Sequence, residues 1–161
     1  MVSYRLVIGI IVGICFSFLT VFFFNMDNVI LRIELYLGSD PLKVIILMIG
    51  ANFEFDIISF FTSNPEFLEI FSPQILASII IGYVVGTMVK GVKRSLTASS
   101  LVIVVDFLIW MLLSVISGED LMALFQGAQL SATIGGVLTG MIGALIGGLL
   151  GGLITGPFEE M

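Results

Sequence analysis

The sequence predicts an all-α integral membrane protein, a single domain over residues 1–161 built as a bundle of four transmembrane helices. Hydrophobic residues make up 58% of the chain and charged residues only 11%, whereas a soluble domain is about 25% charged. The mean hydropathy is +1.21. A chain of this length cannot hide so much apolar surface from water inside one core. Several apolar runs, moreover, approach the roughly 20 residues that a membrane helix needs.

Four of these runs are predicted transmembrane helices, at about residues 6–24, 74–89, 96–116 and 130–155. The first run is too long for the apolar core of a signal peptide and no cleavage site follows it, so we expect it to be retained. Ser72 and Pro73 are typical of a helix start and precede the second run. Gly118 follows the third run and Gly156-Pro157 follows the fourth, as expected at helix ends.

The basic residues predict the orientation. Arg5 and the turn Lys90–Arg94 would face the cytoplasm, where Lys and Arg are in excess. The loop 25–72 has two basic and seven acidic residues and would lie outside. We therefore expect a protein of the cell (plasma) membrane with both termini in the cytoplasm. Its pI near 4.3 argues against a nucleic-acid partner, which requires a basic surface.

The outer loop contains an apolar run, 42–61, that resembles a fifth span. Glu54, Asp56 and the sequence Gly50-Ala51-Asn52 argue against this interpretation, and a fifth span would place the termini on opposite sides. We expect instead short helices that lie on the outer leaflet or dip into it.

Two starts for these short helices are predicted, at Ser39–Pro41 and at Asn64–Glu66. Residues 31–37 alternate between apolar and charged, which suits a short strand or an interfacial segment. A set of phenylalanines is expected to anchor the loop in the membrane: Phe53, Phe55, Phe60, Phe61, Phe67 and Phe71.

The last span is rich in glycine, with nine glycines among residues 135–156. Small residues recur every fourth position in two neighbouring rows, and Gly82 and Gly86 repeat the spacing in the second span. Such rows let helices in lipid approach closely. These rows would pack on the second span, on another copy of the chain or on a larger complex. Alternatively, they would line a pore or a lipid groove. One row is Gly136, Gly140, Ala144, Gly148, Gly152 and Gly156; the other is Gly135, Thr139, Gly143, Gly147, Gly151 and Thr155.

This glycine spacing resembles that of the glycine-rich helix in the rotor-ring proteolipids of rotary ATPases, which is paired with a helix that carries a membrane carboxylate. The resemblance covers one helix and its style of packing. Here the carboxylate, Asp106, lies in the span before the glycine-rich one, whereas in that family the glycine-rich helix comes first. The long acidic loop has no counterpart there either.

Asp106 is the one ionisable residue well inside a predicted span, about 15 Å from its start. An aspartate at that depth costs roughly 2.5–3.5 kcal/mol and is a functional candidate. No Lys or Arg lies deep enough to pair with it, so we expect a protonated carboxyl. It would be a hydrogen-bonding group between helices, a proton or cation site, or a contact for another subunit. Trp110, one turn on, would pack beside it or point at a partner. Hydroxyl partners within reach are Thr87, Ser114, Thr133 and Thr139.

The predicted function is a non-enzymatic one, a packing or scaffold subunit of a homo- or hetero-oligomeric membrane complex whose partners are lipid and copies of itself or larger proteins. The alternative is a proton or cation pathway centred on Asp106, with Trp110 and Ser114 beside it. An intramembrane aspartyl protease would need two facing carboxylates and a metalloprotease would need histidines, which the chain lacks. With Cys15 as its single cysteine, we expect no disulfide, metal site or cofactor.

Overall fold

The computed structural model describes residues 4–24, 26–62, 71–118, 120, 122 and 125–157. Every regular element in these ranges is helical. The elements are α1 (Tyr4–Phe24), α2 (Met26–Tyr36), α3 (Pro41–Gly50), the 3-10 helix η1 (Ala51–Phe53), α4 (Ile57–Thr62), α5 (Pro73–Val89), α6 (Val92–Ile116) and α8 (Gly127–Ile154).

Several helices begin and end at the residues that the sequence predicts. The side chain of Asp40 accepts a hydrogen bond from the backbone N–H of Leu42 at 3.1 Å, which caps the start of α3. Ser72 caps α5 in the same way. After α6 and α8 the chain turns at Gly118 and Gly156, whose φ angles of 78° and 72° suit glycine. The predicted start at Asn64–Glu66 lies outside the described residues.

Four segments in the described ranges are long and apolar enough to cross a membrane: Tyr4–Phe24, Pro41–Thr62, Val92–Ile116 and Gln129–Ile154. The prediction of an all-helical chain with four such segments is confirmed, and three of the four overlap predicted spans. The four segments are not the four predicted spans, because the sequence places Pro41–Thr62 in the outer loop. Conversely, the predicted span at 74–89 corresponds to α5, which has 17 residues. At 1.5 Å per residue α5 is about 26 Å long, somewhat less than the roughly 30 Å of the hydrocarbon core.

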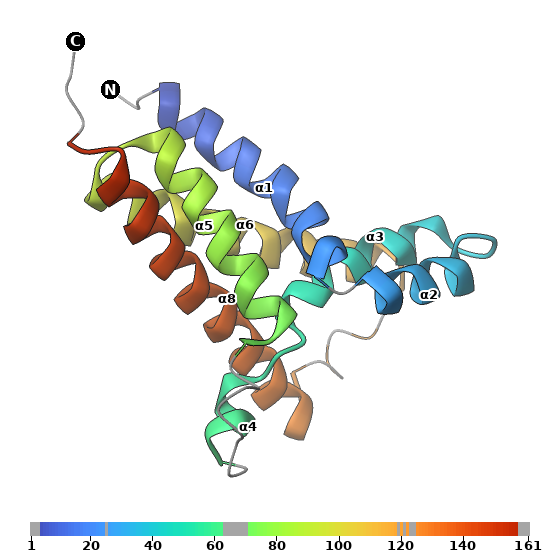
Figure 1. Ribbon diagram of the computed structural model, residues 1–161. Coiled ribbons are helices and arrows are strands. Elements are labelled where there is room, and N and C mark those ends of the chain that lie inside the picture. The colour runs from blue at the N-terminus through green and yellow to red at the C-terminus, as the bar shows by residue number, and fades with distance from the viewer. Residues whose placement is uncertain are drawn as a thin grey trace.

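The segment Pro41–Thr62 is not one continuous helix. It consists of α3, η1, a non-helical stretch at 54–56, and α4. Glu54 and Asp56, the two carboxylates that argued against a span, lie where the helix breaks. The strand considered for residues 31–37 is wrong, because these residues belong mostly to α2. In Figure 1 α2 and α3 lie side by side and project from the bundle.

The helices α1, α5, α6 and α8 form the bundle, with α5 in contact with the other three. Both termini lie at one end of the bundle, near the turn between α5 and α6 (Figure 1). At the other end α3 packs on α6, while η1 packs on α5 and α8. We call residues 51–56, which are η1 and the non-helical stretch after it, the wedge.

The position of the wedge corrects part of the predicted membrane anchoring. Phe53 and Phe60 are buried inside the protein rather than turned toward lipid. Phe61 and Phe71 are exposed and remain available as anchors. Phe67 lies outside the described residues.

Candidate functional site

One small row of α8 faces α5. A Cβ atom at Gly147 would overlap the carbonyl oxygen of Ile79 and lie 2.7 Å from the backbone nitrogen of Tyr83. A Cβ at Gly151 would lie 2.9 Å from the backbone nitrogen of Thr87. The backbones of α5 and α8 therefore touch where these glycines lie. Gly143 belongs to the same row and faces Ser78 and Ile75 of α5.

The other row faces α6 along its second half. A Cβ at Gly152 would lie 2.8 Å from the hydroxyl oxygen of Ser95, and Gly148 sits in the same way against Ser99. The two serines also reach α5, because their hydroxyls donate to the carbonyl oxygens of glycines there. Ser95 donates to Gly86 at 3.1 Å and Ser99 to Gly82 at 3.3 Å. Three helices thus meet through small residues.

Two further positions of that row, Gly140 and Ala144, have different surroundings. At Gly140 an added Cβ would meet only side chains, Ile103 and Phe53, at an ordinary 3.6 Å, so no close backbone approach occurs there. Ala144 packs on α5, since a Cβ at Gly82 would overlap its carbonyl group. Both rows are therefore occupied by neighbours from the same chain, except at Gly156, where an added Cβ would meet no atom within 4 Å. An assembly with other copies or proteins stays a prediction, and the small rows give it no additional support.

Gly135 and Gly136, the first glycine of each row, pack against the wedge. A Cβ at Gly136 would overlap the carbonyl oxygen of Phe53, and one at Gly135 would overlap the side chain of Asp56. The hydroxyl of Thr139 donates to the carbonyl oxygen of Phe55 at 2.7 Å. Buried backbone groups outside a helix require hydrogen-bond partners. The first half of α8 supplies both the space and one of those partners.

Asp106 lies on α6, only 1% exposed and about 15 Å from the end of that helix. Neither of its carboxyl oxygens has a hydrogen-bond partner in the described part of the chain, so none of the four expected hydroxyl partners binds it. Thr87 and Thr139 donate to backbone carbonyls instead. The hydroxyl of Ser114, also on α6, is buried and likewise has no partner among the described residues.

One polar residue from another element lies at Asp106, and a second is joined to its backbone. The hydroxyl of Ser17 on α1 is beside the carboxyl, although it donates to the carbonyl oxygen of Ile14 at 2.7 Å. The side-chain nitrogen of Asn52 in the wedge donates to the carbonyl oxygen of Ser17 at 3.0 Å and to that of Ile49 at 3.3 Å. Its side-chain oxygen is buried and has no partner in the described ranges. Sequence reasoning did not place Ser17 and Asn52 at this site, although each is a polar residue in an apolar run.

The side of Asp106 that leads toward the termini is closed by apolar residues. Val102 lies one turn before Asp106 on α6 and is fully buried. It packs in one cluster with Ile81, Val85 and Val89 of α5, and α1 covers this cluster with partly buried apolar side chains. Apolar side chains from α1, α5 and α6 therefore pack together on this side of Asp106.

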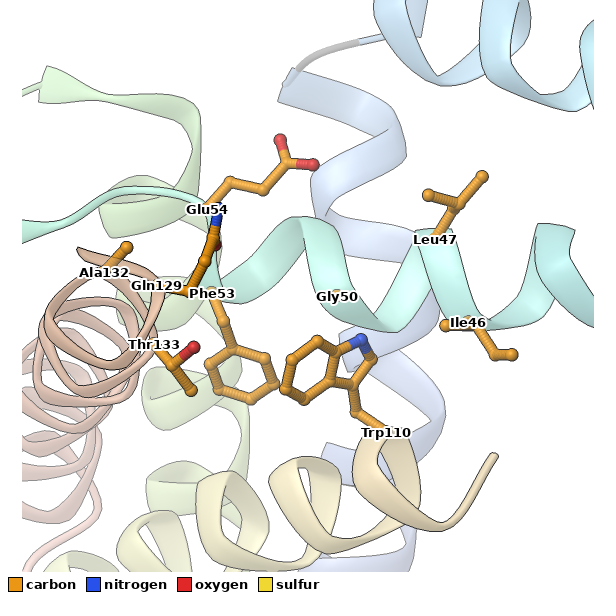
Figure 2. Close-up of a pocket in the computed structure, with 9 residues that line it drawn as sticks. All are labelled: Ile46, Leu47, Gly50, Phe53, Glu54, Trp110, Gln129, Ala132 and Thr133. Carbon is orange, nitrogen blue, oxygen red and sulfur yellow. The ribbon is translucent and has the colours of Figure 1, made fainter. Parts of the chain in front are cut away.

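Aromatic rings border Asp106 toward the other end of the bundle. Trp110, one turn further along α6, packs with its ring centroid 5.9 Å from Phe107 and 6.2 Å from Phe53. A cavity of about 320 Å³ lies beside these rings, between α3, α6 and α8 (Figure 2). Trp110 therefore packs against the wedge and faces this cavity.

Comparisons of the chain with protein-family models, with curated proteins and with solved structures find no match. A function has to be inferred from the chemistry of Asp106, Ser17 and Asn52 themselves.

Proposed function

We propose that this protein binds and releases a proton or a small monovalent cation at Asp106, as part of a transport pathway across the membrane. One observation carries the proposal: the carboxyl is 1% exposed and neither oxygen has a hydrogen-bond partner in the described structure. A buried, unpaired carboxylate is strongly unfavourable. A bound proton or cation would remove that cost, and its reversible exchange is the basis of a transport function.

The groups around Asp106 support such a site. Both carboxyl oxygens are unpartnered acceptors among the described residues, and the hydroxyl of Ser17 lies beside them. Asn52, bound to the backbone of Ser17, has a further buried side-chain oxygen that is unpartnered in the same ranges. Alkali and other hard cations prefer oxygen ligands, and a proton on the carboxyl would supply the donor that these acceptors lack. The wedge adds a broken helix, a feature that membrane proteins tolerate where it is buried or lines a pathway.

The proposed topology places both termini and the Lys90–Arg94 turn in the cytoplasm of a cell whose plasma membrane holds the protein. In it α5 crosses the membrane together with α1, α6 and α8, and the short helices α2, α3 and α4 lie on the outer leaflet or dip into it. Asp106 would then exchange its proton or cation with the outer side, through the wedge. Transport to the cytoplasm would require the apolar layer around Val102 to open.

The test is flux through purified protein in liposomes, measured with an entrapped pH-sensitive dye for protons and with radioactive sodium for cations. We compare the wild type with Asp106→Asn, which keeps the shape of the side chain but does not titrate, and with Asp106→Leu. Asp27→Asn is the matched control, because Asp27 is an exposed carboxylate on α2. We expect flux in the wild type and the control and background flux in both Asp106 variants.

Thermal unfolding of the same samples separates transport from structure. If Asp106 only holds helices together, Asn should behave as the wild type, and Leu should lose roughly 0.6–2 kcal/mol of stability for one polar contact in a membrane. Equal background flux in all proteins, with only Asp106→Leu destabilised, would refute the proposal. A stable Asp106→Asn protein without flux would support it.

The other predicted function, a packing subunit, is decided by the native mass of the protein in nanodiscs. A monomer would exclude it. A defined complex with itself or with other proteins would support it, independently of the result for Asp106.

A further inference from the structure

The cavity between α3, α6 and α8 has a volume of about 320 Å³, near the lower end of the range of about 300–1,000 Å³ for ligand pockets. Ile46 from α3 and Ala132 from α8 form two of its walls, while the rings of Phe53 and Trp110 lie side by side at its base (Figure 2). Its interior is therefore apolar and aromatic. It is large enough for part of a lipid chain or one small molecule.

The rim of the cavity is polar. Gln129, in the first turn of α8, and Glu54, in the wedge directly after η1, both line it and are exposed. The carboxylate of Glu54 points away from the two rings (Figure 2) and forms an ion pair with the guanidinium of Arg32 on α2. Each of these two side chains is 37% exposed. An acidic side chain at the rim of the cavity is thus paired with a basic side chain that lies beside the rim.

We infer that this cavity binds a phospholipid with a zwitterionic head group, taken from the membrane leaflet at this end of the bundle. A segment of one acyl chain would pack on Phe53 and Trp110, whose rings offer large apolar surfaces. The ammonium group would pair with Glu54 and the phosphate with Arg32, whose guanidinium suits phosphate oxygens. This site is separate from the proposed ion site and does not depend on it.

Charge complementarity favours this occupant over others. An anionic lipid would pair with Arg32 but leave its negative charge next to Glu54, and an organic cation would meet the reverse conflict. A molecule without charge would form no ionic contact with Glu54 or Arg32. A head group that carries both signs can pair with Arg32 and Glu54 at once and leaves no like charge beside either of them.

The fluorescence of Trp110 provides a direct test, because it is the only tryptophan of the chain and lies at the base of the cavity. Bromine atoms on a lipid chain quench tryptophan on contact. Wild-type protein in nanodiscs is titrated with phosphatidylcholine brominated in mid-chain. We expect quenching that saturates at a low fraction of brominated lipid, as for binding to one site.

Two variants and a control connect the quenching to the cavity. Ala132→Phe fills the cavity, whereas Ser131→Phe places the same ring on the exposed face of α8 one residue away. We expect saturable quenching to vanish in the first and to persist in the second. Arg32→Gln leaves the cavity open but removes the partner of the phosphate, and should weaken binding about tenfold, equivalent to 1.4 kcal/mol.

Brominated phosphatidylglycerol and a brominated alkyltrimethylammonium ion are the competing probes. Stronger quenching by either would overturn the zwitterionic lipid as occupant. Equal quenching of the wild type and Ala132→Phe would show contact with bulk lipid only and would overturn the site. Asp106→Asn should quench as the wild type does, so a failure of the ion site leaves this result unchanged.

Discussion

Replacing Gly147 with alanine should separate α5 from α8. The new Cβ would overlap the carbonyl oxygen of Ile79 and lie 2.7 Å from the backbone nitrogen of Tyr83. Both atoms belong to the backbone of α5, so no side-chain rotation relieves the overlap. To restore the usual 3.5–4.0 Å between non-bonded atoms at the closer of these contacts, α5 has to withdraw by roughly 2 Å.

The expected loss of stability is the difference of two effects. Overpacking of this kind costs about 1–3 kcal/mol, and a rigid backbone wall places Gly147 in the upper part of that range. Alanine returns roughly 0.5–1 kcal/mol, because glycine loses more backbone freedom in a helix. We therefore expect Gly147→Ala to lower the free energy of unfolding by about 1–2 kcal/mol.

Gly140→Ala is the matched control on the same helix. An added Cβ there would meet only side chains at 3.6 Å, so the overpacking cost is absent and the gain of about 0.5–1 kcal/mol remains. Unfolding of both variants is followed in mild detergent by titration with sodium dodecyl sulfate, with helicity and Trp110 fluorescence as readouts. Equal stability of the two variants, or a less stable Gly140→Ala, would refute the close contact of α5 and α8 at Gly147.

Three further outcomes are expected. In a Cys15→Ser background, a cysteine at Lys93 should resist an impermeant thiol reagent in intact cells while one at Ser39 reacts; the opposite pattern would invert the proposed topology. Asn52→Ala should destabilise the protein by roughly 0.6–2 kcal/mol in the same detergent titration, because two backbone carbonyls lose their donor; an unchanged unfolding midpoint would contradict this. Gly136→Ala should displace the wedge and lower ion flux in liposomes, and flux equal to the wild type would contradict that effect.

The sequence predicts well the features that depend on local chemistry. The end of α6 before Gly118 and the caps at Asp40 and Ser72 follow from residue types that stabilise helix ends. The start of α6 was expected at Leu96 but lies at Val92, because the basic residues of the preceding turn join the helix. Polarity alone does not distinguish a charged loop from a charged first turn.

The arrangement of the helices is harder to predict from the sequence. In lipid, the face of a helix that packs on protein and the face that meets lipid are both apolar, so little contrast marks the buried side. The glycine rows of α8 indicate close contact but not which neighbour makes it. As a polar residue in an apolar run, Asn52 argues against a span, whereas the structure buries it and binds it to the backbone of Ser17. Its role depends on a contact between residues 35 positions apart in the chain.

The glycines of α8 and the site at Asp106 are physically connected through the wedge. Gly135 and Gly136 leave room for the wedge backbone, and Thr139 binds one of its carbonyl groups. The same wedge carries Asn52 to the backbone of α1 beside Asp106. With larger side chains at these two glycines, the break in Pro41–Thr62 could not pack against α8 in the same way. The carbonyl group of Phe55 would then lose its partner Thr139, at a cost of roughly 1–3 kcal/mol for an unpaired buried group. Close packing at the start of α8 is therefore a requirement for the polar environment of Asp106, while the glycines further along α8 serve the contacts with α5 and α6.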